Sequence, residues 1–191
     1  MSIAELFTTF PYIRTERLFL RQIVSEDAED LYRYYTNPLV TKHLDWLGPS
    51  SIEDSMALIN GWHQAFHARK LLPWGISYGP TAQSEILGTI MIMPTRGNFE
   101  DTPLFPLSVG YELKAEHWNK GIMSEALQAV LDFTRTHVGA RRIQAEVYPE
   151  NAASLRLLKK LGFQEEGLLR QYMMHEVTKK LLDVIMLALL C

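Results

Sequence analysis

A strand-like segment in the middle of this 191-residue chain leads through a short loop with one glycine into an amphipathic helix. Residues 107–113 alternate in character, and residues two apart on a strand share a face, so we expect Glu112 opposite Tyr111 and Leu113. After Gly121 the chain carries a stripe spaced three and four residues apart, formed by Met123, Ala126, Leu127, Val130, Leu131 and Thr134. The pattern predicts a helix to about residue 137 that packs against a sheet.

This joint offers a place for an anion. The first turn of a helix leaves backbone N–H groups unpaired, and with the helix dipole they attract a phosphate or pyrophosphate. Ser124 would add a hydroxyl and Lys120 a positive charge. The alternative is an ordinary strand–loop–helix joint, in which the glycine only eases the turn. The loop lacks the Gly-Lys-Ser/Thr ending of a Walker A loop and the Gly-x-Gly-x-x-Gly of a dinucleotide fingerprint.

The rest of the chain alternates strand and helix signals. We expect a strand at 17–23, a helix at 26–36 capped by Ser25 and stopped by Pro38, and a helix to about residue 69 capped by Ser51. The buried stripe of this last helix is predicted to hold Ile52, Met56, Ile59 and Phe66. Further segments are a hairpin of 74–78 and 86–93, a strand near 143–147, a helix from Asn151 to Gly162, and strands at 163–168 and 181–190. This order indicates a mixed α/β or α+β domain.

Composition and charge exclude several classes of protein. Hydrophobic residues make up 47% and charged residues 21%, which is typical of a globular domain and excludes a wholly disordered chain. The net charge of −3 argues against a nucleic-acid partner bound through a broad basic surface. The longest apolar run, 184–191, is too short for a membrane span, and the start of the chain lacks a signal-peptide pattern. With Cys191 as its single cysteine, the chain is expected to be cytoplasmic and to hold no disulfide or cysteine metal cage.

Histidines give no metal site. His63 and His67 are four residues apart on a predicted helix, a spacing that suits zinc. Gln64 stands where the zinc protease motif has glutamate, and no third ligand is evident, so we expect core or surface histidines and no metal.

Four segments, in order, resemble the GNAT superfamily of N-acetyltransferases, and most closely its RimJ/RimL branch. Residues 118–123, Trp-Asn-Lys-Gly-Ile-Met, are similar to its acetyl-CoA loop, [QR]-x-x-G-x-[GA]; Gly121 matches, while Trp118 and Met123 depart from the pattern. A tryptophan is common at this position in the branch, and the side chain of Met123 must turn into the core. The other segments are Thr15–Arg21 with Asp27-Ala28, Pro149–Ser154 with Leu161-Gly162-Phe163, and Gly167–Arg170 with Asp183.

The resemblance covers about residues 13–190 and implies a single domain over 1–191. It implies a mixed, mostly antiparallel sheet, splayed at two central parallel strands, with about four flanking helices and acetyl-CoA in the gap. The implied activity is direct transfer of the acetyl group from acetyl-CoA to a primary amine in a ternary complex. The acceptor is a protein or peptide N-terminus or a small amine, with no nucleic-acid or membrane partner and a monomer or homodimer as the assembly. The alternative is a module that binds and senses acetyl-CoA without turnover.

The resemblance also assigns the cosubstrate site residue by residue. The positions that match the acetyl-CoA site are Leu113, Trp118, Asn119, Lys120, Gly121, Ile122, Met123, Ser124, Asn151 and Ser154. Asn151 resembles the asparagine that bonds the pantetheine arm, and it would also serve as a plain helix cap.

Two residues are the predicted catalytic groups. Glu112 resembles the glutamate that takes the amine proton, and partial burial would raise its pKa; otherwise it is a solvent-facing glutamate of a sheet. Ser154 is the candidate donor to the CoA thiolate, because Leu158 occupies the position of the family's usual tyrosine. Ser154 would otherwise bond the preceding helical turn, and Tyr148 or water are alternative donors.

Acceptor residues are predicted from position alone. The resemblance places Trp46, Tyr111 and His175 at the substrate cleft. Asp45, beside Trp46, and the pair Glu100-Asp101 would attract a cationic amine. Glu100-Asp101 belong to the long loop 94–106, which would cover the site or, alternatively, be a variable surface loop.

Overall fold

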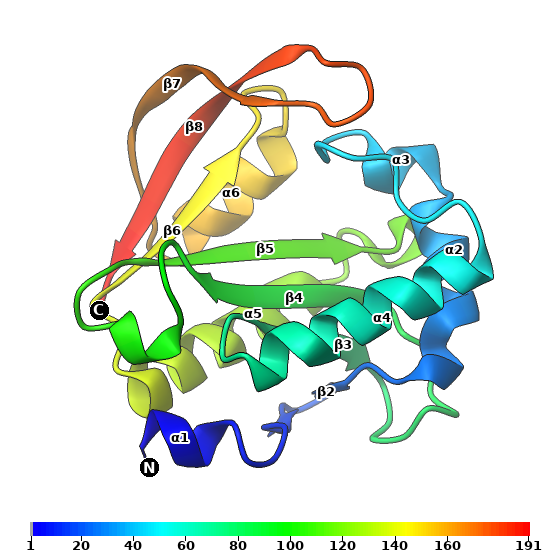
Figure 1. Cartoon of the computed structure of the whole chain (residues 1–191). Helices are drawn as coiled ribbons and strands as arrows, with labels where there is room; N and C mark the ends of the chain where they lie inside the picture. The colour runs from blue at the N-terminus through cyan, green and yellow to red at the C-terminus, as the bar shows by residue number, and fades with distance from the viewer. Residues whose placement is uncertain (1) are drawn as a thin grey trace.

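The computed structural model describes residues 2–191. They form an eight-stranded sheet in the order β1-β2-β3-β4-β5-β6-β8-β7 (Figure 1). The strands are β1 (Ile13–Arg14), β2 (Phe19–Gln22), β3 (Leu72–Ser77), β4 (Gly88–Pro94), β5 (Leu107–Leu113), β6 (Arg142–Val147), β7 (Gln164–Met174) and β8 (Leu181–Leu190). Every neighbouring pair is antiparallel except β5 and β6. The predicted mixed, mostly antiparallel sheet is confirmed.

Within residues 2–191 there are six α-helices, where about four were expected. They are α1 (Ile3–Leu6), α2 (Ala28–Tyr35), α3 (Pro38–Thr41), α4 (Ile52–His67), α5 (Ile122–Phe133) and α6 (Ala152–Lys160). The additional ones, α1 and α3, are single turns, too short to carry a periodic stripe. Short 3₁₀ turns lie at Ser25–Asp27, Phe99–Asp101 and Ala115–His117, and α5 continues into a π-helical turn, Thr134–Val138.

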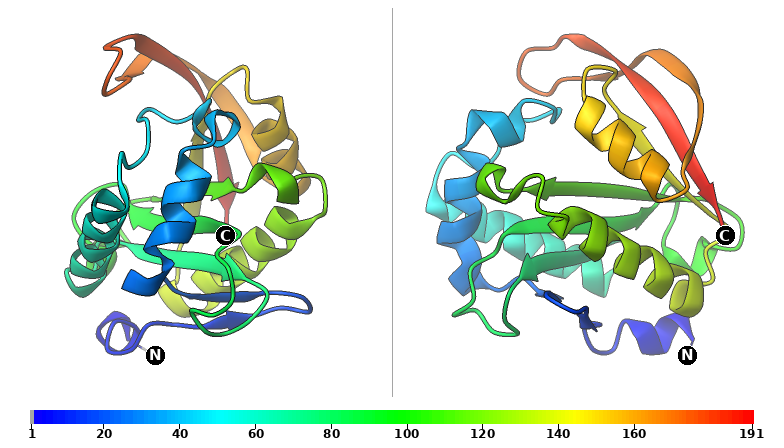
Figure 2. Two further views of the ribbon diagram at one scale, coloured as in Figure 1. Left: turned by 90° about the vertical axis from the view of Figure 1, so that its right-hand side faces the viewer. Right: turned by 180° about the vertical axis from the view of Figure 1, so that it is seen from behind.

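The sheet is covered on both faces. Helix α4 lies in front of the sheet in Figure 1, whereas α5 lies behind it and faces the viewer in the reversed view of Figure 2. The larger core cluster contains the predicted α5 stripe from Met123 to Leu131, and Thr134 is also buried. A second cluster joins α2 and α4 to Ile23 and Ile86. Within the described residues no helix has both the length and the hydropathy that a membrane crossing requires.

Strands β5 and β6 separate soon after they meet. Their parallel pairing joins only Leu107 to Ile143 and Ser108 to Gln144. Beyond Ser108, β5 continues to pair with β4 as far as Leu113, while β6 continues with β8. The predicted splay at two central parallel strands is therefore confirmed, and it opens the sheet beside Glu112.

The buried face of α4 differs from the prediction. Ser51 caps the helix, accepting a hydrogen bond from the N–H of Asp54 at 3.0 Å. The predicted Ile52 and Met56 are 39% and 37% exposed, whereas the residues that face the core are Ser55, Ile59, Trp62 and Phe66. Ile59 and Phe66 belong to both possible buried stripes of this helix. Burial of the Trp62 indole decides for the stripe that leaves Ile52 and Met56 exposed.

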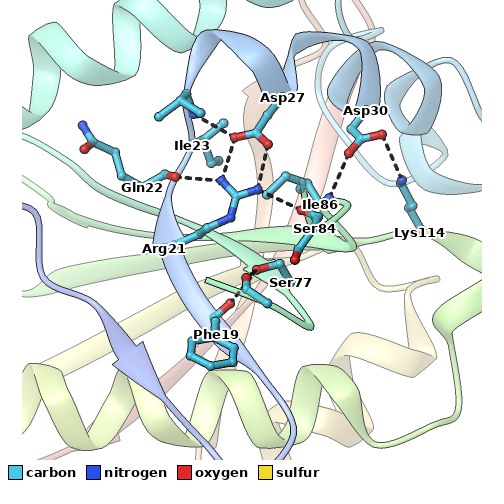
Figure 3. A network of polar contacts seen from close by, with 12 residues as sticks. Phe19, Arg21, Gln22, Ile23, Asp27, Asp30, Ser77, Ser84, Ile86 and Lys114 are labelled. Atoms are coloured by element: carbon cyan, nitrogen blue, oxygen red, sulfur yellow. Dashed lines mark hydrogen bonds and ion pairs between the residues drawn. The ribbon is translucent and has the colours of Figure 1, made fainter. Parts of the chain in front are cut away.

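The start of α2 is organised by an ion pair instead of a serine cap. The predicted cap, Ser25, lies in the 3₁₀ turn, and Asp27 accepts the N–H of Val24 at 2.8 Å. Asp27 also binds both terminal nitrogens of Arg21, at 2.8 and 2.7 Å, and the two side chains are 0% and 2% exposed (Figure 3). Pro38, predicted to stop the helix, lies beyond its end at Tyr35 and begins α3. A buried arginine needs a partner carboxylate, which explains why Asp27 is used here.

The closing hairpin is longer than predicted. Strand β7 reaches Met174 instead of residue 168, with two irregularities in its pairing to β8. The turn that follows donates the N–H of Glu176 to the carbonyl of Asp45 at 2.7 Å. The β7–β8 turn is thereby joined to the segment between α3 and α4, as Figure 1 shows.

Candidate active site

A pocket of about 650 Å³ opens where β5 and β6 separate. One wall is the α3 region from Leu39 to Leu44, and the floor is the end of β5. The loop before α5, with the first turn of α5, and the first turns of α6 complete it. The pocket thus brings together four segments that are distant in the sequence.

The loop before α5 has the geometry of an anion site. Gly121 caps α5 with φ +75°, a left-handed conformation that glycine adopts without strain. Ile122, Met123 and Ser124 form the first helical turn and line the pocket, so their N–H groups lie at a helix N-terminus beside it. The side chain of Met123 is buried in the core, as predicted. The loop thus presents backbone N–H groups and the Ser124 side chain to the pocket.

Trp118 fastens the loop to the end of β5. Its indole N–H donates to the carbonyl of Leu113 at 2.8 Å, while the ring stays 41% exposed in the pocket wall. Asn119 also lines the pocket and has a positive φ of 60°. Lys120 is exposed and lies outside the pocket lining.

Hydrogen bonds from the segment before β2 support the loop that precedes α5. The guanidinium of Arg17 contacts Glu125 at 2.6 Å and donates to the carbonyl of Lys120 at 3.2 Å. The other Glu125 oxygen accepts the hydroxyl of Thr15 at 2.5 Å. Thr15 and Arg17 belong to one of the four segments that resemble the family. They therefore support the loop before α5, which belongs to another of these segments.

Glu112 lies half-buried in the pocket lining. Thr89, its partner in the β4–β5 register, donates its hydroxyl to Glu112 Oε2 at 2.6 Å. The pKa of Glu112 is raised to about 7, chiefly by burial and to a smaller extent by nearby Asp45, against hydrogen bonds from Thr89 and Tyr35 that lower it. A carboxyl with a pKa near neutrality is suited to general-base work.

Glu112 should make stability depend on pH. The folded pKa of about 7 lies above the usual value of 4.5, so the folded chain binds this proton more tightly than the unfolded chain between these values. The cost of burying the charge is absent below pH 4.5, grows with rising pH and is complete above pH 7. We expect the stability of Glu112→Gln, relative to wild type, to rise by about 2–3 kcal/mol of unfolding free energy from pH 5 to pH 8. Urea denaturation at pH 5 and at pH 8 measures this change. A difference in unfolding free energy between variant and wild type that is the same at both pH values would contradict the prediction.

Two hydroxyls meet on the other side of the gap. Tyr111 Oη lies 2.6 Å from Ser154 Oγ, a hydrogen bond that connects β5 to α6 across the splay. Asn151 caps α6 by accepting the N–H of Ser154 at 3.1 Å. Burial raises the pKa of Tyr111 to about 12, so this hydroxyl keeps its proton at neutral pH. Leu158, also on α6, is fully buried and carries no polar group.

Other predicted residues lie outside the pocket lining. Trp46 packs on Tyr35 with 5.1 Å between ring centroids, and the Nδ1 atom of His175 accepts the N–H of Val177 at 3.2 Å within the β7–β8 turn. Tyr148 directs its hydroxyl to the sulfur of Met173 at 3.7 Å. Each of them is held by local packing or by turn hydrogen bonds, away from the pocket lining.

The long loop 94–106 is directed elsewhere. Its Phe99 is fully buried against Phe7, at 5.1 Å between ring centroids, and Glu100 pairs with Arg69 after α4. The loop is therefore tied to α1 and the end of α4, and Glu100 and Asp101 are not part of the pocket lining. Its role as a cover for the site is not supported by this placement.

Comparison with known proteins identifies the family. Residues 17–164 match the profile described as acetyltransferase (GNAT) domain. The chain belongs to the GNAT acetyltransferase family. It is 36% identical over 169 residues to the N-acetyltransferase YoaA of Bacillus subtilis, covering 88% of this chain and 92% of that protein. It is 28% identical over 173 residues to the ribosomal protein uS5 alanine N-acetyltransferase of Escherichia coli, covering 85% and 82% of the two.

Solved structures agree on the fold. Mycobacterium smegmatis RimJ in complex with CoA-disulfide has a TM-score of 0.75 at 24% identity, covering 95% of this chain and 86% of that one. The microcin C7 self-immunity acetyltransferase MccE, in complex with acetyl-CoA and AMP, has a TM-score of 0.76 at 20% identity, covering 93% and 94%. The predicted GNAT fold, the resemblance to RimJ/RimL and the assignment as an N-acetyltransferase are confirmed.

Several residues of this acetyltransferase site are missing from the sequence prediction. The pocket wall formed by Val40, Lys42 and His43 lies in α3 and in the turn that follows it, a stretch that carries no motif. Thr89 and Tyr34, behind Glu112, lie 23 and 78 residues from it in the chain. The alternation of β4 shows that Thr89 shares a face with Met91, but only the strand register places it opposite Glu112.

Across residues 2–191 no group of three histidine, cysteine or acidic side chains is arranged to hold a metal ion. The Nε2 atom of His63, a predicted core or surface histidine, lies 2.7 Å from the carbonyl of Ile23.

Proposed function

We propose that this acetyltransferase transfers the acetyl group of acetyl-CoA directly to a primary amine in a ternary complex, within a single domain. The observation that carries the proposal is one pocket in which a helix N-terminus, a glutamate of raised pKa and a hydroxyl pair lie together. Each feature supplies one requirement of the reaction, namely cosubstrate binding, deprotonation of the amine and stabilisation of the leaving thiolate.

Acetyl-CoA is the proposed cosubstrate. The two solved GNAT structures above hold CoA-disulfide and acetyl-CoA, which supports CoA binding in this family. In this chain the pyrophosphate would sit on the N–H groups of Ile122, Met123 and Ser124, with Trp118 and Asn119 beside it. Leu113 and Asn151 line the inner part of the pocket, where the pantetheine arm would pass.

The chemistry follows from the two sides of the splay. Glu112 accepts a proton from the ammonium group of the acceptor, and the neutral amine nitrogen attacks the thioester carbonyl carbon. The tetrahedral intermediate loses a further N–H proton to solvent, the C–S bond breaks, and the amide forms. CoA leaves as a thiolate that takes a proton from solvent to become the thiol, and Glu112 gives its proton back to solvent. Ser154 donates a hydrogen bond to the departing sulfur, and Tyr111 donates to Ser154. Positioning two bound reactants in this way supplies a large share of the rate.

A protein N-terminus is the first acceptor class to test. The Escherichia coli relative is named for the alanine of ribosomal protein uS5, which supports a polypeptide amine. Small amines form the second class. A panel of peptides that begin with alanine or serine, polyamines and amino acids tests both, with release of the CoA thiol and product mass as readouts. Transfer to one class supports the proposal, whereas acetyl-CoA binding with no transfer to any amine would favour the sensing module.

The hydroxyl pair gives a prediction on kcat. Removing the bond to the departing sulfur by Ser154→Ala should lower kcat by about 10²-fold, in the range of a lost oxyanion-type donor. Tyr111→Phe should lower kcat by roughly tenfold, because it removes only the hydrogen bond that Tyr111 donates to Ser154. Because Tyr111 acts through Ser154, the double variant should match Ser154→Ala alone. Steady-state kinetics with saturating acetyl-CoA measure all three, and simple multiplication of the two losses would contradict the paired role.

A further inference from the structure

Two hydroxyls behind Glu112 form a hydrogen-bonded chain that the reaction described so far does not use. Thr89 Oγ1 lies 2.6 Å from Glu112 Oε2, and Tyr34 Oη lies 3.1 Å from Thr89 Oγ1. Both residues are buried, Thr89 at 0% and Tyr34 at 2% exposure. They come from β4 and α2, so two separate elements converge on one carboxylate.

The direction of this chain follows from the chemistry of its members. An ionised carboxylate only accepts hydrogen bonds, so Thr89 gives its single hydroxyl hydrogen to Glu112. Thr89 then has only lone pairs left for Tyr34, which must be the donor of the second bond. Tyr34 therefore donates to Thr89, and Thr89 donates to Glu112, so the two bonds stabilise the ionised form of the carboxyl. Hydrogen bonds to a charged acceptor are shorter and stronger than neutral ones, which fits the 2.6 Å contact.

We propose that Thr89 is a positioning residue of this acetyltransferase, whose hydroxyl, oriented by Tyr34, directs the Glu112 carboxylate into the pocket and keeps it ionised. The proposal rests on the proposed function of Glu112 as the base. It adds a residue that touches neither acetyl-CoA nor the amine and acts only through Glu112.

The other charged groups around Glu112 are few. From α2, Tyr34 and Tyr35 face it, and burial raises the pKa of both hydroxyls well above their usual value, so they stay neutral. Asp45, between α3 and α4, raises the pKa of Glu112 by repulsion. Lys114, the residue after the end of β5, pairs with Glu85 and also lies near Asp30, as Figure 3 shows for Asp30. Substituting Thr89 removes a hydrogen bond and leaves these charges in place.

The experiment compares Thr89→Val with Thr89→Ser. Valine keeps the shape of threonine and removes the hydroxyl, whereas serine keeps the hydroxyl. We expect Thr89→Val to move the acidic limb of the kcat/KM profile upward by about one pH unit, the size of a lost bond to a charged group. Below pH 7 the loss is then about tenfold, and above pH 9 it shrinks to less than threefold. Thr89→Ser should stay within about 0.3 unit of wild type, and Tyr34→Phe should shift the limb in the same direction by less.

A direct titration separates this inference from the proposed function. The pKa of Glu112 is followed by NMR of ¹³C-labelled carboxyl groups, assigned with Glu112→Gln, in the wild type and the two Thr89 variants. A higher Glu112 pKa in Thr89→Val but not in Thr89→Ser supports the positioning role even if no amine is acetylated. An unchanged pKa, or an equal loss of activity at every pH in both variants, overturns it. Transfer activity with an unshifted acidic limb overturns it while leaving the function of Glu112 intact.

Discussion

Replacing Glu112 by glutamine should lower kcat/KM for acetyl transfer by about 10²–10⁴-fold, the usual contribution of a general base. Glutamine keeps the size of the side chain and its place opposite Thr89 but cannot accept a proton. The loss should therefore fall mainly on transfer to the amine, with acetyl-CoA affinity changed by less than about threefold, because binding energy and base catalysis come from different walls of the pocket. Initial rates of CoA release, paired with binding titrations, measure both.

The same variant should also change the pH profile. A base works only when deprotonated, so the activity of the wild type should rise with pH and level off above the Glu112 pKa of about 7. Glu112→Gln should lose this acidic limb. Glu116→Gln is a matched control, since Glu116 is exposed and lies outside the pocket lining close by in the chain. An acidic limb that persists in Glu112→Gln would assign the base to another group.

Breaking the Arg21–Asp27 pair should cause the largest loss of stability. The pair is buried at 2% and 0% exposure, and Asp27→Ala leaves a guanidinium without its partner and the N–H of Val24 without an acceptor. Arg21 would keep only the carbonyls of Gln22 and Ser84 (Figure 3). Removing one member of such a pair costs about 3–5 kcal/mol. Urea denaturation measures the loss of unfolding free energy.

An exposed ion pair provides the matched control. Arg33 and Glu29, on the neighbouring α2, are 66% and 58% exposed, four residues apart. Glu29→Ala should cost about 0.5 kcal/mol or less, because solvent screens exposed pairs. If Asp27→Ala were as mild as Glu29→Ala, the buried network would not organise the start of α2.

Local sequence patterns predict those parts of the fold that are formed by residues close together in the chain. The segment from β5 through the loop into α5 is contiguous, so its alternation, glycine and apolar stripe predict the strand that carries Glu112 and the helix that follows Gly121. The stripe of α5 is confirmed because apolar residues fill one face without interruption. The stripe of α4 is wrong because two faces carry apolar residues and packing of Trp62 decides between them.

Long-range pairing accounts for what the sequence could not show. Thr89 meets Glu112 through the register of β4 and β5, and Tyr111 meets Ser154 only because β5 and β6 separate. The resemblance places Trp46 and His175 at the substrate cleft, whereas aromatic stacking and a turn hydrogen bond hold them outside the pocket lining. Register and splay depend on the whole sheet, so no local motif encodes these contacts.

Calorimetric titration with acetyl-CoA and with CoA tests the central claim most directly, namely that the gap between β5 and β6 holds the cosubstrate on the first turn of α5. The matched variant is Gly121→Val, which forces a β-branched residue into the left-handed cap with φ +75° and disturbs the loop without touching Glu112. We predict micromolar binding of both ligands to the wild type and at least tenfold weaker binding to Gly121→Val. Absence of binding to the wild type at millimolar concentration would contradict the account.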